Sequence, residues 1–413
     1  MSSTTRPGTC QPPTGPSSRD RWPRRLSFPL DPSKIDGNFA GYARLRAERP
    51  VCPVVLANGQ HAWLVTRYSD VRLVLSDARF SKAALTWPDS PKIHSGPLLP
   101  GLLLTTDPPE HTALRAPLTP LMGKKEMARR RPRLVVAAQD VLDEFALRRP
   151  PSDFVTGFAG PLATRAICDL LGLPVTEQAR FTAWAEPALG GLGHPVDEVN
   201  RAQRHMLGYL AEVVASTRAR PADDLLSSLA RNGSGLPDEA VVKLGATLLV
   251  TGIETMTAAI AKAVLALLTR FPAVPALPAD PGARQLMIEE ILRFVTFGET
   301  VRSRRALVDA RLGDVMIGRG DIVLVSTGSA NQDEAGFPAA AEFDPARRPN
   351  RHLAFGRGIH VCLGAALARL ELEVALEQLS RRLPKLRLAV PPDRVEARVG
   401  SAEIPPAALP VLW

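Results

Sequence analysis

Apolar residues recur every three or four positions through most of the chain, which is the spacing of amphipathic helices. This pattern predicts helices over 111–122, 133–148, 158–171, 196–216, 237–269 and 284–294, with a shorter helix inside 31–50. A helix is also expected after Ser69, whose hydroxyl suits an N-cap. Strand-like runs are few and occur at 61–68, 309–318 and 321–328. The fold class is therefore predicted to be mainly α with a small β portion.

Two segments break the helical pattern. Residues 1–29 are rich in Pro, Ser, Thr and Arg and lack the apolar run of a signal peptide, so we expect a disordered tail there. A single domain is then expected over 30–413. Residues 85–109 contain six prolines and predict a long connecting loop. Long loops in compact domains are usually functional.

One stretch, 244–268, is apolar enough to resemble a membrane span, which needs ~20 mostly apolar residues. Glu254 and Lys262 interrupt this stretch, and no second span follows it. We interpret it as a long helix through the core of a soluble protein with no membrane partner.

Composition narrows the functional classes. Hydrophobic residues make up 45% and charged residues 23% of the chain, which is typical of a globular protein. The net charge is +9, but aromatic residues are only 5% and do not interleave with a basic stripe, so nucleic-acid binding is not expected. The four cysteines lie far apart without a CxxC pair, which argues against a zinc knuckle and favours a reducing cytoplasm.

The candidate chemistry is concentrated in FGRGIHVCLG, residues 355–364, which leads directly into a helical pattern. Gly356 and Gly358 permit backbone conformations that other residues avoid, so the loop can bring Cys362 against a flat cofactor. The start of the following helix would favour a thiolate through its unpaired amides and its dipole. The alternative, an ordinary buried cysteine, leaves the glycines, Phe355 and the following helix unexplained.

The segment resembles the haem-binding loop of the cytochrome P450 superfamily in its soluble bacterial form. That loop reads FGxGxHxCxG, and every fixed position is present here. The resemblance extends over about 30–413. It implies the triangular-prism fold of the superfamily, haem b as the cofactor, and Cys362 as the thiolate ligand of the iron. Phe355 and Gly364 are then expected beside the haem.

A second match lies in the helix predicted over 284–294. Glu290 and Arg293 match the ExxR pair of the superfamily, and Arg347 matches the arginine that completes its structural network. The resemblance implies a buried network. Without it, an exposed i,i+3 ion pair would be the default interpretation.

The resemblance also assigns partners to the two haem propionates, which need cationic or hydrogen-bonding groups when buried. His111 and Arg115 match an HxxxR pattern of the superfamily, Arg304 matches an arginine of its central β-hairpin, and His360 lies two residues before the cysteine. The alternative for each of the four is a solvated surface residue.

In the long helix, Glu254 and Thr255 match the acid–alcohol pair that delivers protons during dioxygen activation. Thr251 stands where a small residue is usual, so it either tunes the substrate position or bonds to a backbone carbonyl. Glu403 and Glu299 are conspicuous charges, and a solvent-facing position is the alternative for both. By position, the substrate pocket is expected to include Leu248, Leu249, Thr251, Gly252, Thr296, Phe297, Glu299 and Ala402.

The resemblance implies a monooxygenase that activates dioxygen and hydroxylates or epoxidises a small, largely apolar metabolite, as in secondary-metabolite biosynthesis. Two electrons are expected from a ferredoxin and its NAD(P)H-dependent reductase, because no flavin or iron–sulfur module is appended. The enzyme is expected to be a cytoplasmic monomer. The alternatives are a haem-thiolate enzyme that catalyses oxidative coupling or rearrangement without oxygen insertion, and a non-catalytic haem-binding protein.

A basic cluster follows the helix that contains His111. It either docks an acidic ferredoxin or forms a solvated charged face. Its members are Lys124, Lys125, Arg129, Arg130 and Arg131.

Overall fold

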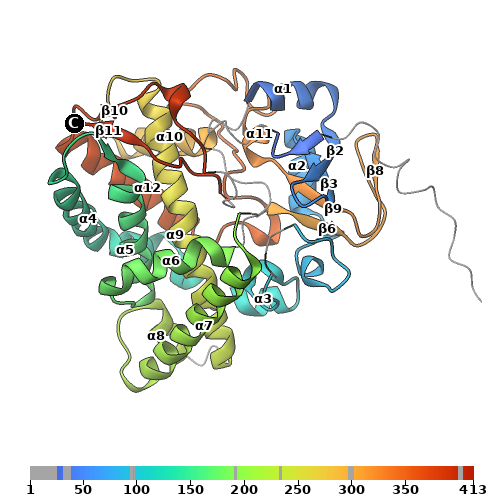
Figure 1. Cartoon of the computed structure of the whole chain (residues 1–413), viewed down its shortest axis with the longest axis horizontal. Helices are drawn as coiled ribbons and strands as arrows, with labels where there is room; N and C mark the ends of the chain where they lie inside the picture. Colours follow the sequence, from blue (N-terminus) through green and yellow to red (C-terminus); the bar gives the residue numbers. More distant parts are fainter. Residues whose placement is uncertain are drawn as a thin grey trace, which may run out of the picture.

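The computed structural model describes residues 26–30, 39–93, 96, 98–189, 193–231, 235–295, 302–398 and 403–413. Helices dominate this part of the chain, which confirms the predicted fold class. Figure 1 shows helices α4 to α8 on one side of the molecule and the largest sheet, with α1 and α2, on the other. The helices are α1 (Phe39–Glu48), α2 (Tyr68–Ser76), α3 (Glu110–Arg115), α4 (Lys124–Ala146), α5 (Gly160–Leu171), α6 (Gln178–Leu189), α7 (Val196–Ala219), α8 (Leu225–Arg231), α9 (Asp238–Leu268), α10 (Pro281–Phe294), α11 (Thr327–Asn331) and α12 (Ala365–Arg382).

Helix α9 is the centre of the helical side. It contacts α5, α6, α7, α8, α10 and α12, so it is surrounded by other helices for most of its 31 residues. A helix that is apolar all round is expected to be buried in this way. By length and composition α9 could cross a membrane, but 78% of its most apolar stretch is buried inside the protein. The interpretation of 244–268 as a core helix is therefore confirmed.

The strands form one six-stranded sheet and two smaller sheets. The order in the large sheet is β1-β2-β3-β9-β6-β4. The second sheet has the order β10-β11-β5, and β7 and β8 form a hairpin. The strands are β1 (Leu26–Phe28), β2 (Val51–Leu56), β3 (His61–Val65), β4 (Phe80–Ser81), β5 (Ser152–Asp153), β6 (Arg304–Ala306), β7 (Ala310–Leu312), β8 (Val315–Ile317), β9 (Ile322–Val325), β10 (Arg387–Leu388) and β11 (Pro410–Leu412).

The ordered domain begins earlier than expected. Strand β1 lies inside the segment 1–29 that was expected to be a disordered tail, and it pairs in parallel with β2. Phe28 is 5% exposed and packs in the core beside the sheet. The alternating Leu26–Ser27–Phe28 run is too short to predict a strand within a proline-rich sequence. The strand forms because β2 supplies its hydrogen-bond partners.

Several helix boundaries also differ from the predictions. Helix α4 begins at Lys124 and contains Pro132, although the helix was expected to start only after this proline. Contacts from its first half to α5 and α12 compensate for the lost backbone bond, as Arg130 pairs with Asp169 and Arg131 pairs with Glu377. The helix predicted over 111–122 is divided into α3 and a 3₁₀ turn at Pro120–Met122.

Ser69 is not the cap of α2, which already begins at Tyr68. The Tyr68 amide instead donates to the Asp333 carboxylate at 2.8 Å, so the cap comes from a distant segment. Over its described residues the proline-rich segment 85–109 contains only parts of two short 3₁₀ turns, which agrees with the predicted loop. Helices α6 and α8 and strand β2 were not predicted.

Candidate functional site

A large cavity lies between α9, the start of α12 and the loop that connects to α12. Its empty volume, counted with the open space at its mouth, is about 1390 Å³. Cys362, Thr255 and Arg304 all line it, although they come from three separate parts of the chain. The cavity therefore brings the predicted site residues of three segments together.

The cysteine loop, residues 352–364, has the backbone conformation that its glycines predict. Gly356 and Gly358 have φ values of +69° and +75°. A Cβ atom on Gly358 would lie 2.4 Å from the carbonyl oxygen of Leu75 in α2, so only glycine fits this close approach. The Cys362 amide donates to the Phe355 carbonyl at 2.9 Å, which closes the loop just before α12.

The Cys362 thiol opens into the cavity and is enclosed by protein on its other sides. Burial raises the pKa of this thiol, while a hydrogen bond from the Gly364 amide and the positive charge of Arg302 act in the opposite direction. Among the described residues no group of three or more His, Cys, Asp and Glu side chains could hold a metal ion.

One side of the cavity is a charged wall, made of Lys82, His111, Arg115, Arg302, Arg304 and His360. Arg304 is 3% exposed, and Nη1 donates to the carbonyls of Arg302 and Ser303 at 3.2 and 2.9 Å. Burial lowers its pKa to about 10. His111 is 2% exposed, and its buried Nε2 has no hydrogen-bond partner in the described part of the chain. Such a wall suits an anionic cofactor, since buried cations and donors need partners.

Asp107 is the carboxylate at the edge of the charged wall. It accepts a hydrogen bond from Ser81 and one from the Lys82 amide, and it lies 3.5 Å from Nε2 of His360. Burial alone would raise its pKa, but the interaction with His360 and the hydrogen bonds from Ser81 and the Lys82 amide lower it to about 2. The pKa of His360 falls to about 4, mainly because of burial. Sequence reasoning missed both Lys82 and Asp107, although Asp107 precedes the matched His111 by one helical turn.

Helix α9 presents Thr251 and Thr255 to the cavity. Each hydroxyl donates to the carbonyl four residues earlier, at 2.7 Å for Thr251 and 2.6 Å for Thr255. Thr251 thus bonds to a backbone carbonyl and also lines the cavity. Leu248 and Gly252 line the cavity too, whereas Leu249 is 0% exposed and packs into the core, so its expected place in the pocket is wrong.

Glu254 does not line the cavity, and it is 8% exposed. Burial raises its pKa to about 8, and the negative charge of Glu186 adds to this shift while Arg398 opposes it. The carboxyl group is therefore mostly protonated near neutral pH, one residue away from the Thr255 hydroxyl.

The cavity lining also includes Glu403, which is 1% exposed, so the solvent-facing alternative for it is wrong. Its carboxylate lies 3.9 Å from Arg302, and its carbonyl accepts from buried Lys262 at 2.9 Å. Four other pocket candidates lie outside the described residues: Thr296, Phe297, Glu299 and Ala402.

A second pocket of about 730 Å³ shares Lys82, Leu104, Thr247 and Thr251 with the cavity. Its remaining lining is mainly apolar, with Thr105, Gln203 and Ser303 as polar exceptions. It lies against α7 and the loop before α3, and it extends the cavity away from Cys362.

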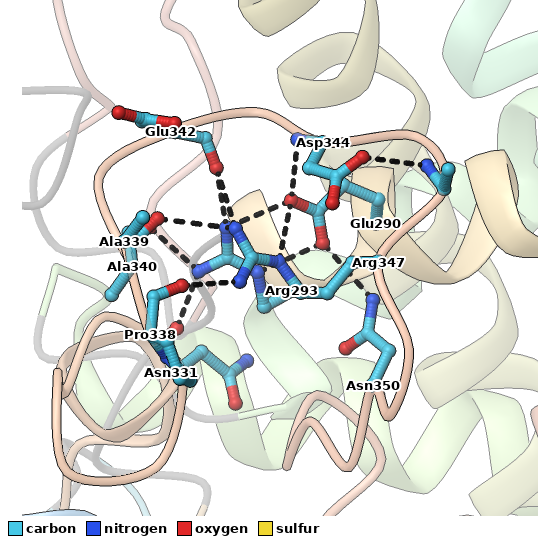
Figure 2. A network of polar contacts seen from close by, with 11 residues as sticks. Glu290, Arg293, Asn331, Pro338, Ala339, Ala340, Glu342, Asp344, Arg347 and Asn350 are labelled. Carbon is cyan, nitrogen blue, oxygen red and sulfur yellow. Dashed lines mark hydrogen bonds and ion pairs between the residues drawn. The ribbon is translucent and has the colours of Figure 1, made fainter.

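Figure 2 shows the polar network around Glu290, and none of its labelled residues lines the cavity. Glu290 and Arg293 are both 0% exposed and form a two-armed ion pair with N–O distances of 2.9 Å. Arg347 donates to Glu290 at 3.1 Å, and Asn350 donates at 3.0 Å. The predicted buried network is confirmed, and it fixes the segment 331–350 that leads into the cysteine loop.

Fewer side chains of the basic cluster of α4 are exposed and unpaired than a docking surface for an acidic partner would use. Arg130 is 8% exposed and bonds to Asp169, and Arg131 bonds to Glu377 of α12. Arg129 is exposed and pairs with Glu126. Only Lys124 and Lys125 remain as exposed members without an ion pair in the described part of the chain. Carboxylates of α5 and α12 thus pair with Arg130 and Arg131, and Glu126 of α4 itself pairs with Arg129, so two of the five basic side chains stay unpaired among the described residues.

Comparisons with known proteins agree with this site. A profile of the family described as Cytochrome P450 matches residues 285–396. Nocardicin C N-oxygenase of Nocardia uniformis subsp. tsuyamanensis is 39% identical, over 94% of this chain and 98% of the relative. Mycinamicin IV hydroxylase/epoxidase of Micromonospora griseorubida is 38% identical, over 90% of this chain and 94% of the relative.

Solved structures extend the similarity to three dimensions. A mixed-function cytochrome P450 in complex with mycinamicin V has a TM-score of 0.84 at 38% identity, covering 94% of this chain and 100% of the other. A cytochrome P450 with biaryl coupling reactivity has a TM-score of 0.85 at 34% identity, with the same coverage. Fold and site thus define a haem-dependent oxidoreductase. The chain belongs to the cytochrome P450 family, a family of monooxygenases, and has its fold.

Proposed function

We propose that Cys362 binds the iron of haem b and that the charged wall holds the haem propionates. The observation that carries this proposal is the pairing of one cavity-facing thiol with a wall of buried cations and donors. Among the described residues His111 Nε2 has no hydrogen-bond partner, and the hydrogen bonds described for Arg304 go to neighbouring carbonyls, so both retain capacity for an anion. Arg115 and His360 complete this set, and Phe355 and Gly364 pack beside the thiolate.

When bound, a haem-thiolate group supplies the reductive activation of dioxygen. Two residues of α9, Thr255 and Glu254, then deliver protons to the site. Because the Thr255 hydroxyl donates its hydrogen to the Thr251 carbonyl, its oxygen remains an acceptor that can position a water in the cavity. Glu254, protonated because its pKa is about 8, is the group that resupplies protons from the outer side of α9.

The substrate site is formed by the second pocket and the adjoining part of the cavity. The lining is mainly leucines from the loop before α3 together with Val250 and Met206, which suits a small, largely apolar metabolite. Thr251 lies at the junction of the two spaces, where it can contact a substrate that extends toward Cys362. Relatives that act on nocardicin C and mycinamicin IV support a role in secondary-metabolite biosynthesis.

The electron donor is a ferredoxin with its NAD(P)H-dependent reductase, and the enzyme works as a soluble monomer in the cytoplasm. Lys124 and Lys125 follow closely after Met122, which lines the cavity. Exposed lysines at this place can attract an acidic partner.

A second candidate function is oxidative coupling without oxygen insertion, which the similarity to the biaryl-coupling structure favours. Product analysis under labelled dioxygen separates the two functions. The proposed monooxygenase places one labelled oxygen atom in each product molecule. A coupled product that contains no labelled oxygen would replace hydroxylation or epoxidation by coupling.

A further inference from the structure

Helix α10 carries two adjacent carboxylates with different neighbours. Glu290 belongs to the buried network described above, whereas Glu289 turns toward the cysteine loop and α12. Both carboxylate oxygens of Glu289 accept from Arg369 of α12, at 2.5 and 2.8 Å. Burial alone would raise the pKa of Glu289, but the contacts with Arg369 and His352 lower it to about 2. The ion pair is therefore fully charged at neutral pH.

His352 fixes the other side of Glu289. Its Nε2 lies 2.9 Å from the carboxylate, and its Nδ1 accepts from the Ala354 amide at 3.3 Å. Because Nδ1 is an acceptor, the ring proton lies on Nε2 and is donated to Glu289. The first residues of the cysteine loop are thereby tied to α10 by the imidazole ring.

Arg369 connects this ion pair to the cavity wall. Its guanidinium lies over the Phe355 ring, 4.4 Å from the ring centre, and Phe355 lines the cavity together with Cys362. The Phe355 carbonyl accepts from the Cys362 amide at 2.9 Å, so the residue that Arg369 covers is bonded directly to the cysteine that would bind the iron. Glu289 opposes the positive field of Arg369 at this place, since it puts a negative charge on the same guanidinium.

We propose that Glu289 and Arg369 are positioning residues that set the electron affinity of the iron at Cys362. The inference rests on the proposed binding of haem iron by Cys362. Arg369 stabilises added negative charge at the thiolate, and Glu289 limits this stabilisation while His352 holds Glu289 in place. Electrons enter this site one at a time, so the balance of two opposite charges decides how readily the first electron is accepted.

The test is the reduction potential of the purified holoprotein. Glu289→Gln keeps the shape and the acceptor oxygen but removes the negative charge, so the equilibrium constant for one-electron reduction should rise about threefold to tenfold. A tenfold change corresponds to about 59 mV for one electron. Arg369→Gln should lower the constant by a similar factor, and the double variant should return near the wild-type value.

Arg369→Lys separates charge from packing, because it keeps the positive charge but loses the two-armed contact and most of the stacking. Its potential should stay closer to wild type than that of Arg369→Gln. Arg381→Gln is the matched control, since Arg381 lies on the same helix with a 70% exposed side chain. Its potential should not change.

Single variants with the wild-type potential, or with shifts in the same direction, would overturn the inference and leave the three residues a purely structural role. If Glu289→Gln yields no holoprotein, the comparison of Arg369→Gln with Arg369→Lys still decides. Failure of the proposed function looks different, because the wild-type protein itself would then lack the carbonyl spectrum of a thiolate-bound haem.

Discussion

Two buried arginines, Arg293 and Arg304, differ in how many of their N–H donors are bonded to protein acceptors. Arg293 has all five of its N–H donors bonded to protein acceptors: two oxygens of Glu290 and the carbonyls of Asn331, Ala340 and Glu342. Arg304 is almost as deeply buried, but the hydrogen bonds described for it come from Nη1 alone. An arginine whose N–H donors are all bonded to protein stabilises the fold. An arginine with donors that have no described protein acceptor can still bind a ligand.

The same contrast holds for the anionic partners. Glu290 accepts five hydrogen bonds from three side chains and the Asp344 amide. The charged wall of the cavity contains six basic or imidazole side chains, whereas its carboxylate, Asp107, lies at the edge beside His360. Substitutions in the Glu290 network should therefore act on folding, and substitutions in the charged wall should act on the cofactor.

The largest effect is expected for Glu290→Ala, which leaves Arg293 and Arg347 without their carboxylate. Breaking a buried ion pair costs ~3–5 kcal/mol, out of a typical total stability of ~5–15 kcal/mol. Little folded protein should accumulate, as measured by soluble yield and thermal unfolding. Glu48→Ala, at an exposed i,i+4 pair with Arg44, is the control and should have no effect. A normal unfolding temperature for Glu290→Ala would show that the network is not needed for stability.

Thr255→Ala tests whether this cavity-lining hydroxyl takes part in proton delivery. Loss of a positioned proton donor or acceptor lowers the rate of the step that depends on it by roughly 10²- to 10⁴-fold. Folding and substrate binding should persist, but a smaller fraction of NAD(P)H consumption should end in oxygenated product. Thr269→Ala removes the same kind of back-bond at the end of α9 and should keep full coupling. Undiminished coupling in Thr255→Ala would assign proton delivery to another group, such as Thr251.

Arg304→Leu should separate cofactor binding from folding. Removing a hydrogen bond to a charged group costs ~1.5–3 kcal/mol, so haem affinity should fall by about 10- to 100-fold. The apoprotein should unfold at a temperature near that of wild type, because no carboxylate loses its partner. Arg311→Leu, in the exposed hairpin strand β7, is the control for haem titration. Unchanged haem affinity in Arg304→Leu would remove Arg304 from the propionate site.

These contrasts also show what the sequence could predict. The long helices with regular apolar spacing were predicted, although α4 begins earlier and 111–122 is divided. The Cys362 loop, Glu290, Arg293 and Arg347 were found from local motifs. Lys82 and Asp107 were missed because long-range packing of β4 and the loop before α3 brings them to the cavity. No local pattern marks Lys82, and the only local sign of Asp107 is its place four residues before His111.

Helix α9 shows a second limit. Leu248 lines the cavity and its neighbour Leu249 is buried in the core. Because α9 is apolar on nearly all sides, no polar face indicates how the helix is rotated, so adjacent leucines could not be distinguished. Arg130 was likewise assigned to the surface because its partner Asp169 lies on a different helix.

The smallest effect is expected at the exposed lysines of α4. Replacing Lys124 and Lys125 with Glu should slow reduction by a ferredoxin several-fold at low salt, and the difference should shrink as the Debye length falls toward ~8 Å. Lys385→Glu makes the same kind of charge change at another exposed position and should not slow reduction. Reduction rates that are insensitive to salt and to both lysines would remove this docking site.

The carbonyl spectrum of the reduced protein tests the central claim most directly, because it reports the ligand opposite carbon monoxide. Wild-type protein should show the red-shifted band of thiolate-bound haem, and Cys168→Ala should keep it, since Cys168 is buried away from the cavity. Cys362→Ala should lose the band even where haem is still bound. A Cys362→Ala protein that retains the thiolate-type band would contradict the assignment of Cys362 as the iron ligand.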